Sequence, residues 1–99
     1  GLTLPQSIAN GKSVWNQYTI RVQEQTADPA DSQRDRLRAK LQEKGVLSAV
    51  YYPLALHLQP AYQSLGYQPG QLPEAERASR EVLSLPMFPE LTADQQEQV

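Results

Sequence analysis

With 99 residues, the chain is long enough for one domain around a single hydrophobic core. Its nine basic and eleven acidic residues are interspersed, which excludes the basic patch of a nucleic-acid or membrane-surface binder. The chain has no cysteine and a single histidine, which excludes disulfide scaffolds, thiolate metal sites and histidine-rich metal sites. No apolar run reaches the ~18 residues that predict a transmembrane helix.

The N-terminal part of the chain combines a loop and a strand. Residues 1–12 have no hydrophobic period and contain Pro5 and Gly11, so we expect a loop there. Over residues 13–23, apolar and polar side chains alternate, and β-branched and aromatic residues are frequent, which predicts a strand. Trp15 is expected to be a packing residue of this strand rather than a ligand contact.

A polar stretch over residues 24–30 predicts a loop that leads into an amphipathic helix over residues 31–44. Asp31 or Ser32 is expected to cap the N-terminus of this helix. Gly45 suits the turn that follows it, because glycine adopts a positive φ at little cost. The charged face of the helix, expected to be solvated, includes Arg34, Arg36 and Arg38. Its apolar stripe contains Leu37 and Leu41.

The rest of the chain predicts short strands and helices. Residues 46–52 are rich in β-branched and aromatic side chains and predict a second strand, which ends at Pro53. The further expected elements are a short helix over 59–65 with Pro60 in its first turn, a helix beginning at Pro73 with Glu74 and Glu76 in its first turn, an extended segment over 85–89, and a helix capped by Thr92 and Gln95. This order predicts an α/β (α+β) two-layer fold, with a small sheet of about three strands and helices on one face.

The candidate ligand-binding residues are Tyr51, Tyr52 and His57. The two tyrosines end the second predicted strand and so point to opposite faces of the sheet. One of them belongs to the core, and the other is available to a ligand or a neighbouring domain. His57 lies in a loop between two prolines, where it either donates a hydrogen bond to an anion such as phosphate or only bonds a backbone carbonyl.

No catalytic, cofactor-binding or metal-binding residue is predicted. One histidine and scattered carboxylates give no spacing typical of a Ser/His/Asp triad, and no glycine-rich loop joins a strand to a helix to hold a phosphate. A Schiff-base lysine needs a desolvated amine with a depressed pKa, whereas the lysines here lie on the charged helix or in a polar loop. They are Lys12, Lys40 and Lys44.

Several stretches, in the same order along the chain, resemble the DegT/StrS family of pyridoxal-phosphate-dependent sugar aminotransferases. Trp15–Val22 is similar to the strand that opens the family's C-terminal domain, and Tyr51–Tyr62 resembles its H-Y-P-x-P-L-H-x-Q loop. Tyr51 stands where many relatives have histidine, and Ala55 where many have proline. The other matching stretches are Arg34–Leu41, Glu43–Val46, Leu65–Tyr67, Ala75–Ala78 and Ser84–Thr92.

This resemblance implies that the chain is the C-terminal small domain of an aspartate-aminotransferase-like fold, cut from a longer enzyme. Residues 13–99 would form the domain, and residues 1–12 would be the linker from the large domain. The parent enzyme would transfer an amino group, from glutamate, to a nucleotide-linked keto sugar, as a homodimer in the cytoplasm. Pyridoxal phosphate and the lysine that carries it would belong to the large domain, so the chain alone is expected to bind no cofactor and to be inactive.

The resemblance also implies that Tyr51, Tyr52 and His57 lie near the sugar nucleotide and bind it. Two alternatives stay open: a non-catalytic ligand-binding or regulatory module of the same fold, and a purely structural interaction domain. A reading frame that extends upstream into a large α/β domain with a lysine at a strand-to-loop junction would favour the enzyme.

Overall fold

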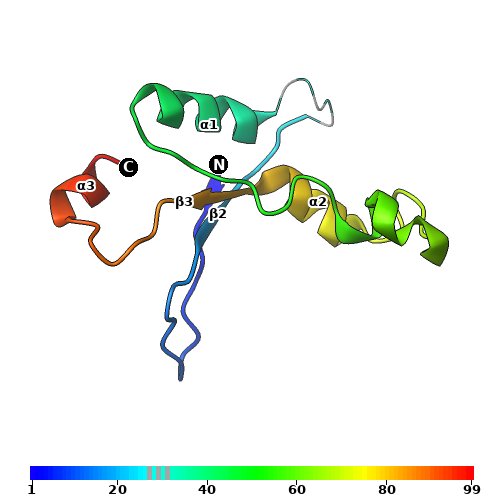
Figure 1. Cartoon of the computed structure of the whole chain (residues 1–99), viewed down its shortest axis with the longest axis horizontal. Coiled ribbons are helices and arrows are strands. Elements are labelled where there is room, and N and C mark those ends of the chain that lie inside the picture. The colour runs from blue at the N-terminus through cyan, green and yellow to red at the C-terminus, as the bar shows by residue number, and fades with distance from the viewer. Residues whose placement is uncertain (27, 29, 31) are drawn as a thin grey trace.

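The computed structural model describes the whole chain except residues 27, 29 and 31. Its centre is a three-stranded antiparallel sheet in the order β1-β2-β3. The strands are β1 (Leu2–Thr3), β2 (Tyr18–Val22) and β3 (Val82–Leu85). Helix α1 (Gln33–Glu43) crosses one face of the sheet, and helix α2 (Pro73–Glu81) runs directly into β3 (Figure 1).

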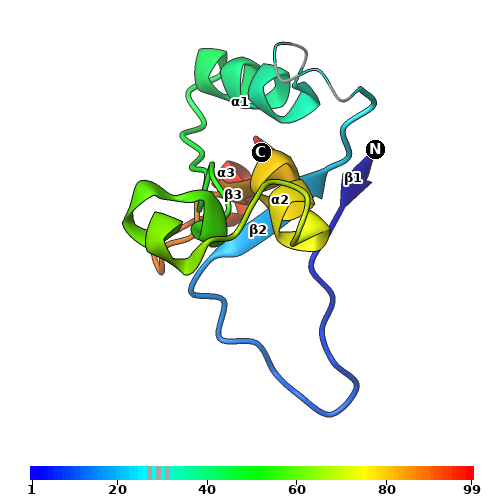
Figure 2. The same ribbon diagram turned by 90° about the vertical axis from the view of Figure 1, so that its right-hand side faces the viewer.

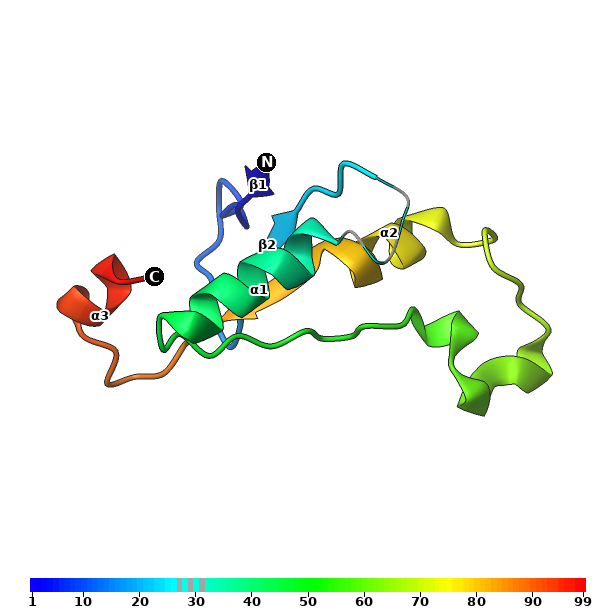
Figure 3. The same cartoon turned by 90° about the horizontal axis from the view of Figure 1, so that it is seen from above.

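The other elements extend to the two ends of this two-layer body. The 3₁₀ helices η2 (Leu56–Leu58) and η3 (Pro60–Leu65) lie at the α2 end, and α3 (Ala93–Glu97) lies at the opposite end (Figure 3). The long connection between β1 and β2 projects away from the sheet on the side opposite α1 (Figure 2). The predicted fold class, a small sheet with helices in a second layer, is confirmed.

The hydrophobic core lies between α1 and the sheet. Ile20 and Val22 of β2 are buried at a spacing of two, as the alternating pattern predicts for a strand. Leu83 of β3 is fully buried between them and the helix side chain of Leu41, and Val46 closes the core just after α1. Partly buried side chains packed against this cluster are Tyr18, Leu37, Val50 and Leu85.

Strand β2 is shorter than the predicted strand over 13–23, because it begins only at Tyr18. Trp15 has a φ of 43°, which lies outside the β region, so the extended conformation cannot continue through it. Its ring packs against Tyr18 with the ring centroids 5.1 Å apart, in the packing role that the sequence predicts.

Two further predictions of strand positions are wrong. Leu2 and Thr3, expected in a loop, pair with Val22 and Arg21 and form the edge strand β1. Residues 46–52, expected to be a strand, make only one bridge, in which Ala49 exchanges two backbone hydrogen bonds with Ser84 (3.0 and 2.7 Å). The first residue of this segment bonds to the helix and not to a strand, since the Val46 N–H donates to the Leu41 carbonyl at the end of α1 (2.8 Å).

The last strand also lies earlier than predicted. The extended segment was expected over 85–89, whereas β3 spans Val82–Leu85. Pro86 and Pro89 have no N–H to donate to a neighbouring strand, so the pairing stops before them. Val82 is the first residue of this strand and directly follows the last residue of α2.

The predicted helix ends are mostly confirmed. Ser32 caps α1 by accepting a hydrogen bond from the Asp35 N–H (3.2 Å), whereas Asp31, the other predicted cap, is outside the described residues. Gly45 has the expected positive φ, 80°, after α1. Thr92 and Gln95 form the predicted capping box of α3. The helix expected at Pro60 is a 3₁₀ helix, with the proline in its first turn.

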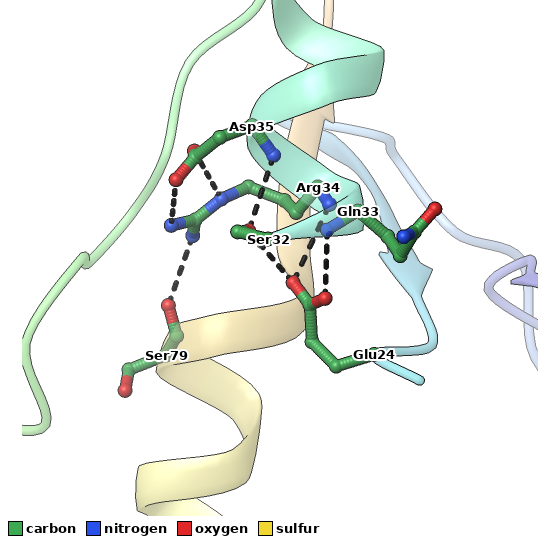
Figure 4. A network of polar contacts seen from close by, with 6 residues as sticks. All are labelled: Glu24, Ser32, Gln33, Arg34, Asp35 and Ser79. Atoms are coloured by element: carbon green, nitrogen blue, oxygen red, sulfur yellow. Dashed lines mark hydrogen bonds and ion pairs between the residues drawn. The ribbon is translucent and has the colours of Figure 1, made fainter. Parts of the chain in front are cut away.

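Glu24 anchors the N-terminus of α1 to the end of β2 (Figure 4). Its carboxylate accepts hydrogen bonds from the Ser32 hydroxyl (2.7 Å) and from the backbone N–H groups of Gln33 (2.7 Å) and Arg34 (3.4 Å). Burial raises the pKa of this carboxyl, but the bonds from Gln33, Ser32 and Arg34 outweigh burial and hold the pKa below its ordinary value.

Arg34 extends the same network to α2. It is only 8% exposed, so the prediction that it belongs to a solvated face is wrong, although Arg36 and Arg38 are exposed. Its Nε donates to Oδ1 of Asp35 (2.7 Å), and its Nη1 donates to the Ser79 carbonyl (3.0 Å). These bonds connect the start of α1 to the last turns of α2 (Figure 4).

Replacing Glu24 by alanine should lower the free energy of unfolding at neutral pH by about 1–2 kcal/mol, because two helix N–H groups lose their acceptor. Since the folded-state pKa of Glu24 is depressed, this stabilisation is present above the unfolded pKa and is lost as pH falls through the folded one. Urea denaturation of the unsubstituted protein and of Glu24→Ala should therefore show a difference in the free energy of unfolding that becomes smaller below pH ~4. Glu43→Ala is the control, because Glu43 is an exposed carboxylate at the end of α1. A difference in the free energy of unfolding that stays constant with pH would contradict the prediction.

Candidate functional site

An apolar groove of about 640 Å³ is lined by residues of α2 and of the segment that carries η2 and η3. Four of the five tyrosines of the chain line it, and His57 lies among them. The wall from α2 is made of small residues, which leave room between the helix and the aromatic rings. The tyrosines are Tyr51, Tyr52, Tyr62 and Tyr67, and the small residues are Ala75, Ala78 and Ser79.

Tyr51 and Tyr52 both belong to the groove. They are 50% and 62% exposed, and their rings meet edge to face with the centroids 6.2 Å apart. The expectation that one of them lies in the core is wrong, because residues 46–52 are not a regular strand and do not alternate between two faces of a sheet. Two phenol hydroxyls are therefore available at the same site.

His57 is buried at the base of the groove, with a side chain only 5% exposed. Its Nε2 lies 3.0 Å from Oε1 of Glu76, and its ring meets Tyr67 edge-on with the centroids 6.0 Å apart. The expected alternative of a bond to a backbone carbonyl is therefore wrong for Nε2, since the partner is a carboxylate. The other alternative, a contact to an anionic ligand, stays a prediction.

Glu76, which the sequence analysis placed only in the first turn of a helix, is the carboxylate partner of His57. Its carboxylate also accepts the backbone N–H of Gly70, at 2.8 Å to Oε1 and 3.0 Å to Oε2. Burial raises the pKa of Glu76, but the hydrogen bonds from Gly70 and His57 outweigh burial, so the pKa lies below its ordinary value. In the sequence Glu76 is visible only as an acid in the first turn of a helix, and nothing there indicates its partner nineteen residues earlier.

The described residues do not fit a pyridoxal phosphate site. A lysine must form the Schiff base in a desolvated place, but Lys12, Lys40 and Lys44 are all exposed and none lines the groove. Among the described residues, no cluster of histidine and carboxylate side chains could hold a metal ion. In the same part of the chain, every helix is too short or too polar to cross a membrane.

Comparison with curated proteins finds relatives along almost the whole chain. The chain is 52% identical over 95 residues to the "pleiotropic regulatory protein" of Geobacillus stearothermophilus. The alignment covers 96% of this chain and 23% of the relative. It is 36% identical to the dTDP-3-amino-3,4,6-trideoxy-alpha-D-glucose transaminase of Streptomyces venezuelae, with the same two coverages. The chain thus spans about a quarter of the length of the curated relatives it matches.

Comparison with solved structures agrees with this result. The crystal structure of S. venezuelae DesV in complex with a ketimine intermediate superposes with a TM-score of 0.85 at 35% identity, over 99% of this chain and 24% of DesV. A DegT/DnrJ/EryC1/StrS aminotransferase from Brucella abortus superposes with a TM-score of 0.79 at 37% identity, over 98% of this chain and 24% of that protein. The predicted small-domain fold of these aminotransferases is confirmed.

The family profile is consistent with both comparisons. The sequence profile described as the DegT/DnrJ/EryC1/StrS aminotransferase family matches residues 2–99. The match thus includes both the groove and the core beneath α1. The chain therefore belongs to the DegT/DnrJ/EryC1/StrS aminotransferase family.

Proposed function

We propose that this chain is the C-terminal small domain of a pyridoxal-phosphate-dependent enzyme that transfers an amino group from glutamate to a nucleotide-linked keto sugar. The names of several relatives support this substrate class. Besides the S. venezuelae dTDP-sugar transaminase, the chain is 35% identical to a UDP-N-acetyl-3-dehydro-alpha-D-glucosamine 3-aminotransferase of Acidithiobacillus ferrooxidans. A cytoplasmic homodimer is part of the proposal.

The observation that carries the proposal is the tyrosine-lined groove without a lysine. Aromatic rings with hydroxyl groups can both stack on a sugar or base and donate hydrogen bonds to it. In the proposal, Tyr51, Tyr52 and His57 hold and orient the sugar nucleotide, and the small domain closes this side of the site to water. Pyridoxal phosphate, held by the large domain of the full-length protein, supplies the electron sink for the amino transfer.

A second candidate is a regulatory module of the same fold. The name of the 52% identical Geobacillus relative, and that of the "erythromycin biosynthesis sensory transduction protein" of Saccharopolyspora erythraea, favour it. Turnover separates the two candidates. Full-length protein supplied with pyridoxal phosphate, glutamate and dTDP- or UDP-linked keto sugars should produce 2-oxoglutarate and an amino sugar. Binding of the nucleotide sugar without any turnover would favour the regulatory module.

The chain alone is expected neither to bind pyridoxal phosphate stoichiometrically nor to transaminate, because all of its lysines are exposed and lie outside the groove. After mixing with the cofactor and reduction with borohydride, mass spectrometry should find no single lysine fully modified. The full-length protein, treated in the same way, is the positive control. A one-to-one adduct on Lys12, Lys40 or Lys44 would contradict the prediction.

A further inference from the structure

The carboxylate of Glu76 connects His57 of the groove to the loop between η3 and α2. From α2 its Oε1 lies 3.0 Å from Nε2 of His57, and its two oxygens accept the backbone N–H of Gly70 (2.8 and 3.0 Å). The side chains of His57 and Glu76 are only 5% and 13% exposed, so water competes little for these hydrogen bonds. This arrangement restricts both the position and the chemistry of the imidazole.

An ionised carboxylate can only accept hydrogen bonds. Because the hydrogen bonds around Glu76 favour its ionised form, the proton between the two residues belongs to Nε2 of His57. In the neutral ring, Nδ1 is then without a proton and is an acceptor. Nδ1 makes no hydrogen bond within the described part of the chain, so it is the ring nitrogen that is available to a ligand.

We propose that Glu76 is a positioning residue that fixes His57 as the Nε2–H tautomer, so that His57 contacts the nucleotide-linked sugar through Nδ1. The proposal rests on the function proposed above for the groove. In this tautomer the neutral ring accepts a hydrogen bond from a ligand hydroxyl or N–H group, rather than donating one to a phosphate oxygen. Glu76 therefore determines which ligand atoms His57 can recognise.

The same carboxylate also orders the loop that covers His57. Gly70 has a φ of 88°, a conformation that favours glycine, and its N–H turns toward Glu76. Tyr67, in the same loop, packs edge-on against the imidazole ring. Loss of the carboxylate is thus expected to release the ring and the loop together. If Glu76 positions His57 for the sugar nucleotide, only the half-reaction with that substrate is affected. If Glu76 only supports folding, both half-reactions are affected.

The tautomer can be measured directly. In full-length protein labelled with ¹⁵N-histidine, the signals of His57 are those that disappear in His57→Gln. At a pH where the ring is neutral, we expect Nε2 to show the shift of a protonated nitrogen and Nδ1 that of a bare one. In Glu76→Ala the two tautomers should exchange. A protonated Nδ1 with a bare Nε2 in the unsubstituted protein would overturn the proposal.

Kinetics then test the positioning role. Glu76→Ala should raise the KM for the sugar nucleotide about 10-fold and leave the half-reaction with glutamate unchanged. Glu76→Gln keeps an acceptor oxygen for Nε2–H and should stay within about 3-fold of the unsubstituted protein. Glu74→Ala, on the exposed side of the same helix turn, is the matched control and should change neither half-reaction.

The outcomes separate this inference from the function on which it rests. A loss in His57→Ala with none in Glu76→Ala would refute the positioning role alone. Equal losses of Glu76→Ala in both half-reactions would also refute it. No loss in either variant would refute the contact between His57 and the sugar nucleotide, and with it the proposed role of the groove, even if the Nε2–H tautomer is observed.

Discussion

Replacing Leu83 by alanine is expected to lower the free energy of unfolding by about 2–5 kcal/mol. Leu83 is the one large side chain with no exposed surface in the described part of the chain. It lies on β3 opposite Ile20 and packs in the same cluster as Leu41 of α1, so its removal leaves a cavity at the centre of the interface between the sheet and α1. Small domains have a total stability of about 5–15 kcal/mol, so the substitution should remove a large part of it.

The measurement is urea denaturation followed by circular dichroism. The dependence of the free energy of unfolding on urea concentration is fitted separately for each protein. Leu47→Ala is the matched control, because Leu47 is 74% exposed and the same atoms are removed. Its effect should stay within about 0.5 kcal/mol. A Leu83→Ala protein as stable as Leu47→Ala would show that the core described between α1 and the sheet is wrong.

His57→Ala in the full-length protein is expected to raise the KM for the sugar nucleotide about 10- to 100-fold. The expected loss is large because the imidazole is buried at the base of the groove and already oriented by Glu76. The half-reaction with glutamate should hardly change, because glutamate carries no nucleotide sugar into the groove. The two half-reactions are therefore measured separately, by single-turnover kinetics.

The competing explanation is that His57 only holds the loop around Gly70 and Tyr67 in place. In that case the substitution would lower thermal stability and would affect both half-reactions to the same extent. Gln63→Ala, an exposed residue of η3 outside the groove, controls for general damage to this part of the chain. Equal losses in both half-reactions, or none, would exclude His57 as a substrate contact.

Features of the fold that depend on neighbours in sequence could be predicted. Alternation identifies β2, since Ile20 and Val22 must share the buried face. The cap at Thr92 and the turn at Gly45 follow from hydrogen bonds and backbone preferences within a few residues. Edge strand β1 could not be predicted, because Leu2 and Thr3 have no pattern of their own and are strands only through pairing with β2.

In the candidate site, too, the sequence indicates the local features, whereas the contacts between distant residues could not be predicted. The resemblance indicated Tyr51, Tyr52 and His57, and all three line one groove. The pair of His57 and Glu76 could not be predicted, because it forms only when the loop between η3 and α2 folds back on itself. Local patterns therefore located the segments of the site, and tertiary folding decided which side chains meet.

Helix α2 and strand β3 join without an intervening residue, since α2 ends at Glu81 and β3 begins at Val82. The junction is tied to β2 by the ion pair between Arg21 and Glu81, with 2.6 Å between Nη2 and Oε2. One wall of the groove, formed by α2, and the centre of the core, formed by β3, thus belong to one continuous segment of chain. Because no connecting residue lies between them, a rotation of α2 would have to bend the chain at Val82 or move β3 with it. For the ligand proposed above, this wall of the groove would already be in place, so binding should cost little conformational entropy on that side.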